Sequence, residues 1–132
     1  MAVDKATGKV NVKRVVTAVD VGIQINPEGL RQQSEGCVTM GLGFCLGEAI
    51  QFRGNQILTK GFGDYVMPRF SWVPKIEVVL VESPETVTIG AGELSITPMG
   101  PVIANAIHDA IGVRMNELPM TPAKIKAAIA RG

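Results

Sequence analysis

The chain has 132 residues and a mass of 14.0 kDa, a length that predicts a single domain with a core of its own. Hydrophobic residues make up 46% of it and charged residues only 19%, which excludes a disordered chain. The net charge is +1 and the charges are scattered, so the sequence offers no basic field for nucleic acid or for an anionic membrane.

A strand is expected over Lys13–Val21, where β-branched residues are frequent and Gly22 follows. A helix then begins at Pro27, with Asn26 as its N-cap, and runs to about Leu46. Each glycine inside a helix costs ~1 kcal/mol relative to alanine, so the missing side chains must serve the close approach of a backbone or a ligand. The helix contains four: Gly29, Gly36, Gly41 and Gly43.

Two further strands, Glu48–Phe52 and Gln56–Thr59, are predicted to form a hairpin around Gly54. Lys75–Glu82 is rich in β-branched residues and is also predicted to be a strand. The second helix is expected from Pro98 or Met99 to Ile111.

Thr97 is predicted to cap this second helix, and Gly112 to end it. A short C-terminal helix is capped by Thr121 and begins at Pro122. The fold class is therefore α+β, with a mainly antiparallel sheet packed by two longer helices and a short C-terminal helix. Residues 1–12 are expected to form a flexible N-terminal segment and residues 13–132 the single domain.

Several kinds of site and segment are not expected. Cys37 and Cys45 lie eight residues apart and His108 is the single histidine, so neither a disulfide framework nor a protein-made metal site is predicted. The apolar stretch over residues 86–107 contains a charge and two prolines, which argues against a membrane span. Met1–Lys13 is polar and resembles no secretory signal.

Glu93 is the one charged residue between residues 86 and 107, and it follows Gly90 and Gly92. A carboxylate in apolar surroundings loses hydration and becomes a better proton acceptor near neutral pH, so Glu93 is a candidate general base. Gln33 offers amide donors and an acceptor for an oxo ligand or a pterin edge. From spacing alone, a solvated surface side chain is the favoured interpretation of each residue.

Five segments in this order resemble one family, at residues 19–27, 33–48, 90–93, 101–112 and 118–122. They read VDVGIQINP, QSEGCVTMGLGFCLGE, GAGE, PVIANAIHDAIG and LPMTP. This order resembles the C-terminal part of the large, molybdopterin-binding subunit of the xanthine oxidase and aldehyde oxidase family, in its isoquinoline 1-oxidoreductase-like branch.

The resemblance implies a domain of the molybdenum cofactor-binding type and a hydroxylase that adds water-derived oxygen to an N-heterocycle or an aldehyde. The cofactor would be molybdopterin, in its cytosine dinucleotide form, held in a site that this chain completes only in part. Glu93 would be the general base, and the cofactor would lie against five residues: Gln33, Gly36, Gly90, Ala91 and Gly92. Leu94 and Ser95 stand where the family commonly has prolines, which changes the expected shape of the substrate pocket.

The implied partners are the remainder of the large molybdenum subunit, an iron–sulfur small subunit and a small aromatic or aldehyde substrate. The isolated chain is then expected to be inactive, and the assembly cytoplasmic, or periplasmic if an export signal lies upstream. A mean hydropathy of +0.25 indicates a surface that another polypeptide covers. It also supports the alternative of a non-catalytic interaction domain. A hydrolase that uses Cys37 or Cys45 with His108 is a third, weaker interpretation.

Overall fold

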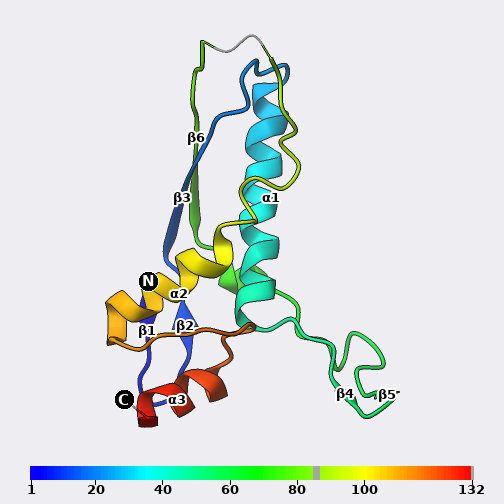
Figure 1. The fold of residues 1–132 in the computed structure, drawn as a ribbon, viewed down its shortest axis with the longest axis vertical. Helices are drawn as coiled ribbons and strands as arrows, with labels where there is room; N and C mark the ends of the chain where they lie inside the picture. Colours follow the sequence, from blue (N-terminus) through cyan, green and yellow to red (C-terminus); the bar gives the residue numbers. More distant parts are fainter. Residues whose placement is uncertain (85–86, 132) are drawn as a thin grey trace.

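The computed structural model describes residues 1–84 and 87–131, which form an elongated molecule (Figure 1). The longest element is the helix α1 (Pro27–Leu46), which runs beside the strands β3 (Arg14–Val19) and β6 (Lys75–Leu80). The helices α2 (Met99–Ile111) and α3 (Pro122–Arg131) lie at the lower end of the molecule in Figure 1, near both chain termini.

The helix α1 begins and ends as its sequence predicts. The Asn26 side-chain oxygen accepts a hydrogen bond from the Gly29 amide at 3.0 Å, and Pro27 occupies the first helical position. At the other end, the Gly47 amide donates to the Gly43 carbonyl at 3.0 Å. These local signals fix both ends of the helix that carries Gln33.

The main sheet differs from the prediction, because β3 and β6 are parallel, in a register that runs from Arg14–Lys75 to Val19–Leu80. The expected antiparallel arrangement is therefore wrong for the longest strand pair. Its physical reason is α1, which carries the chain back along the strands, so that β6 enters the sheet in the same direction as β3. The mixed helix and strand class with three helices is confirmed.

Two antiparallel pairs of two residues each accompany this sheet. The strands β4 (Phe52–Arg53) and β5 (Gln56–Ile57) form the predicted hairpin, with Gly54 at a positive φ of 58° in the turn. Figure 1 shows this hairpin as an arm that projects away from the helices instead of extending the β3–β6 sheet.

Residues 1–12, for which the sequence predicts a flexible segment, contain the second antiparallel pair, β1 (Ala2–Val3) with β2 (Val10–Asn11). The apolar side chains of Val3 and Val10 pack against the main core, and Val12 belongs to it. The N-terminal segment is thus part of the packed structure at the α3 end of the molecule.

The two later helices follow their predicted ends closely, with one correction. Gly112 ends α2 in the left-handed conformation, at φ 79°, and Thr121 caps α3 by accepting from the Lys124 amide at 3.4 Å. Thr97 does not cap α2, because its hydroxyl donates to the Glu93 carbonyl at 3.0 Å.

The core is divided between the two ends of the molecule. The main cluster joins α1, α2 and α3 through fully buried side chains, among them Val38, Leu42, Ile103, Ile107 and Ile125. A smaller cluster of Val19, Val21 and Leu30 lies where α1 begins. Over residues 1–84 and 87–131, no helix has the length and apolar character that a membrane span requires.

Candidate functional site

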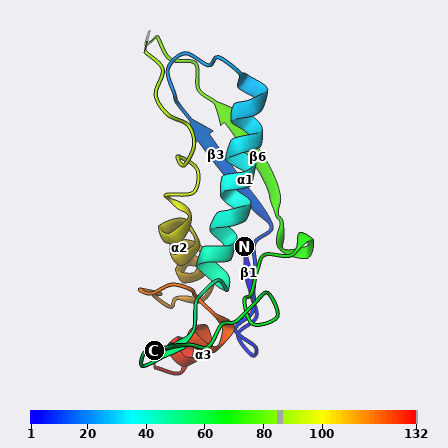
Figure 2. The same cartoon turned by 90° about the vertical axis from the view of Figure 1, so that its right-hand side faces the viewer.

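The segment that carries the predicted base lies against α1. The chain that follows Val87 descends along α1 on the side opposite β6, as Figure 2 shows. The side-chain amide of Gln33 donates to the Gly92 carbonyl at 2.7 Å. Two segments that the sequence analysis singled out, 59 residues apart, are therefore in direct contact.

A second donor reaches the same carbonyl from α1. The Cys37 thiol lies 3.2 Å from the Gly92 oxygen, and the Gln33 amide nitrogen is 3.7 Å from the Cys37 sulfur. Cys37 is buried, with 3% of its surface exposed, whereas Gln33 is exposed. This contact was not predicted from the sequence, although Cys37 lies one helical turn after Gln33 and hence on the same face of α1.

The other side of the segment is bound to β3 and the loop after it. The hydroxyls of Thr17 and the buried Ser95 lie 3.1 Å apart, and the Ile89 amide donates to the Val21 carbonyl at 3.0 Å. The Thr88 hydroxyl donates to the Ile23 carbonyl, also at 3.0 Å. Contacts on both sides therefore fix the segment around Glu93.

Glu93 itself is exposed, which corrects the expectation that the chain places it in dry, apolar surroundings. Scarcity of charge along the sequence does not imply burial, and here the segment lies on the outside of α1. Its backbone carbonyl accepts from the Ile96 amide at 3.2 Å and from the Thr97 hydroxyl. Among the described residues, nothing forms a hydrogen bond or an ion pair with its carboxylate.

The glycines of α1 divide into two kinds. A Cβ built on Gly41 would lie 2.5 Å from Met99 Cγ, and one built on Gly43 would overlap the Glu48 carboxylate. These two glycines serve packing within the chain and not a ligand. Gly36 is exposed, and in the described part of the chain no atom outside its own helix backbone lies within 4 Å of such a Cβ.

Gly90 and Gly92 share this open character, since no described atom beyond their chain neighbours would come within 4 Å of a Cβ on either. Ala91 differs from them, because it is half-buried and packs against the smaller core cluster. Ala91 can therefore offer a ligand little more than its backbone. Within residues 1–84 and 87–131, no three His, Cys, Asp or Glu side chains gather as metal ligands.

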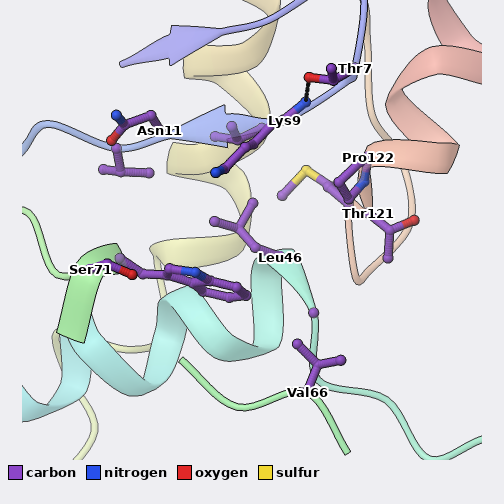
Figure 3. A pocket seen from close by; sticks show the side chains of 13 residues that line it. Thr7, Lys9, Asn11, Leu46, Val66, Ser71, Thr121 and Pro122 are labelled. Carbon is purple, nitrogen blue, oxygen red and sulfur yellow. Dashed lines mark hydrogen bonds between the residues drawn. The ribbon is translucent and has the colours of Figure 1, made fainter. Parts of the chain in front are cut away.

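A pocket of about 600 Å³ lies at the other end of α1, between the N-terminal hairpin and the start of α3 (Figure 3). Leu46 lines it and is thirteen residues after Gln33, roughly 20 Å along the helix axis. None of the predicted site residues lines this pocket. Its walls are mostly apolar, with Lys9 the only charged side chain among them. The lining residues labelled in Figure 3 are Thr7, Lys9, Asn11, Leu46, Val66, Ser71, Thr121 and Pro122.

Comparison with known proteins finds subunits of dehydrogenases and oxidoreductases that are similar to this chain. A nicotinate dehydrogenase subunit of Pseudomonas putida is 38% identical over 129 residues, which cover 98% of this chain and 11% of that protein. The beta subunit of the isoquinoline 1-oxidoreductase of Brevundimonas diminuta is 37% identical over 120 residues, which cover 91% of this chain and 15% of that protein. The chain thus spans a small part of the length of these curated relatives.

The crystal structure of the aldehyde oxidoreductase from Desulfovibrio desulfuricans superposes with a TM-score of 0.85 at 30% identity. The match covers 96% of this chain and 14% of that one. The family model described as the molybdopterin cofactor-binding domain matches residues 1–74, which is more than half of the chain. The chain therefore belongs to the molybdopterin cofactor-binding domain family, that of the molybdenum subunits of xanthine oxidase-type oxidoreductases.

Proposed function

We propose that this chain forms one wall of the active site of a molybdenum hydroxylase and supplies Glu93 as its general base. The contact between Gln33 and the Gly92 carbonyl carries this proposal, because it brings the two motif-bearing segments to one surface. On that surface the Glu93 carboxylate is exposed and has no partner among the described residues, so it is free to accept a proton.

The residues on this surface fit a flat cofactor such as molybdopterin. Gly36, Gly90 and Gly92 present bare backbone, which lets a planar ring approach closely. The Gln33 amide nitrogen is engaged by Gly92 and directed toward the Cys37 sulfur, so its oxygen is the atom left to bind a ligand. An amide oxygen accepts hydrogen bonds, which suits the N–H edge of a pterin better than an oxo group.

The cofactor, when bound, would supply the redox chemistry, and the transferred oxygen would derive from water. The chain's own contribution would be to hold the carboxylate of Glu93 at this surface as the proton acceptor of the reaction. Because Glu93 is exposed here, the water-excluding cover must come from the remainder of the large subunit. We therefore propose that the isolated chain does not turn over.

The substrate class follows from the family and is proposed as an N-heterocycle or an aldehyde. The partners proposed for the assembled enzyme are the remainder of the molybdenum subunit and an iron–sulfur subunit. The cofactor is proposed to be the cytosine dinucleotide form of molybdopterin, with most of its contacts outside this chain.

Replacing Glu93 by glutamine in the assembled protein tests the role of the base. The variant keeps the size of the side chain and removes its charge, so molybdenum and pterin contents should stay at the wild-type level. Turnover should fall by ~10²–10⁴-fold, the usual effect of losing a general base. Glu82→Gln is the matched control, since Glu82 is also exposed but follows β6. Wild-type turnover of Glu93→Gln at every pH would show that the base is another residue.

A further inference from the structure

We infer that Cys37 is a positioning residue for Glu93, a role that rests on the proposed function of that carboxylate. The buried thiol and the exposed Gln33 amide both donate to the Gly92 carbonyl, at 3.2 and 2.7 Å. That carbonyl belongs to the peptide unit that joins Gly92 to Glu93. Because a peptide unit is planar, a fixed oxygen also fixes the direction in which the chain enters Glu93.

Because residue 92 is a glycine, its backbone conformation needs these two hydrogen bonds to be fixed. Without a side chain, Gly92 loses more conformational freedom on ordering than other residues do, and no neighbour packs around its Cβ position. Gly90 adds the same freedom two residues earlier. The two donors from α1 restrict the backbone at the second of these two glycines.

The two donors are not equivalent. Gln33 is exposed and has a long side chain with several torsions, so its amide can rotate away from the Gly92 carbonyl. Cys37 is 3% exposed and has a single short side-chain torsion, so its thiol stays in place when Gln33 rotates. The helix thus holds the Gly92 carbonyl through one adaptable donor and one fixed donor.

Cys45 provides an internal comparison on the same helix. It is 1% exposed and belongs to the main core, and burial raises the pKa of its thiol to about 11. Among the described residues, no hydrogen-bond partner contacts the Cys45 sulfur. Cys45 therefore packs, whereas Cys37 packs and also donates, and substitution of Cys45 reports the packing effect alone.

The test is hydrogen–deuterium exchange, measured by mass spectrometry on the assembled protein, at the amides of Ile96 and Thr97. Both amides donate to the Glu93 carbonyl, so their exchange reports how firmly the turn is held. Cys37→Ala should raise their exchange rate about three- to fivefold, the effect expected from the loss of one modest hydrogen bond. Cys37→Ser restores a donor and should return the rate toward wild type, and Cys45→Ala should leave it unchanged.

Turnover gives a second readout of the same variants. Cys37→Ala should lower kcat at unchanged molybdenum content and KM, because the base is displaced while binding is retained. If Cys37→Ala does not fold, Cys37→Val fills a similar space without a donor and takes its place in the comparison.

The positioning role of Cys37 and the proposed role of Glu93 as the base can be refuted separately. Unchanged exchange at Ile96 and Thr97 in Cys37→Ala, or no recovery in Cys37→Ser, would overturn the positioning role even if Glu93 is the base. Full turnover of Glu93→Gln would instead overturn the proposed function, and the exchange measurement would still decide whether Cys37 holds the turn.

Discussion

Replacing Gly36 by alanine should stabilise the fold and, at the same time, weaken cofactor binding. Gly36 lies in the interior of α1, and an added Cβ would meet no described atom within 4 Å. The substitution therefore carries no steric cost, and the gain is the difference in helix propensity, about 0.8–1.0 kcal/mol. For a chain of this length, that corresponds to a rise in melting temperature of roughly 4 °C.

Two measurements on the same variant separate the two effects. Urea unfolding followed by circular dichroism reports stability, and a shifted midpoint with an unchanged slope would show that only stability changed. Molybdenum and pterin analysis of the assembled protein reports cofactor content, which should fall if the methyl group stands where the cofactor approaches.

Gly41→Ala is the matched control on the same helix. Its Cβ would lie 2.5 Å from Met99 Cγ and 2.8 Å from Met99 Cβ. Such overpacking typically costs about 1–3 kcal/mol, which outweighs the gain in helix propensity, so this variant should be destabilised. A destabilised Gly36→Ala would refute the description of open space at that glycine. A stabilised Gly36→Ala with wild-type cofactor content would refute its place beside the cofactor.

Two further predictions concern stability. Glu77 accepts hydrogen bonds from Arg14 across the β3–β6 pair and forms an ion pair with Lys75, and these contacts lower its pKa to about 2. The folded form therefore favours the charged carboxylate. The resulting stabilisation is present above the ordinary pKa of about 4.5 and is lost as the pH falls toward 2. Melting temperatures measured against pH should show Glu77→Gln below wild type at pH 6 and equal to it near pH 2, and a constant difference would contradict the assignment. Ile107 of α2 is fully buried in the main core, so Ile107→Ala should lower the free energy of unfolding, measured in urea, by about 2–5 kcal/mol. A loss below about 1 kcal/mol would show that α2 is not packed as described.

The elements with strong local signals were predictable from sequence. Asn26 and Pro27 define the start of α1, and Gly54 and Gly112 lie at positive φ in the turn and the helix end where they were expected. In each case the deciding interaction lies within a few residues of the signal, which is why sequence reasoning finds it. The motif order likewise led to the correct family.

The features that depend on distant parts of the chain were missed. The parallel pairing of β3 with β6 depends on the path of a 20-residue helix between them, which strand patterns do not encode. The Thr97 hydroxyl could bind either the first turn of α2 or the Glu93 carbonyl, and in the structure it donates to the carbonyl. The role of Cys37 becomes visible only when the segment around Gly92 is placed on α1.

The most direct test of the proposed function is the native mass of the assembly isolated from its own cell, with molybdenum and pterin measured in the same sample. If the proposed function is right, the complex is much larger than 14.0 kDa and carries about one molybdenum per copy of this chain. A small species without metal or pterin, with the fold intact, would contradict it and would leave an interaction domain as the better description.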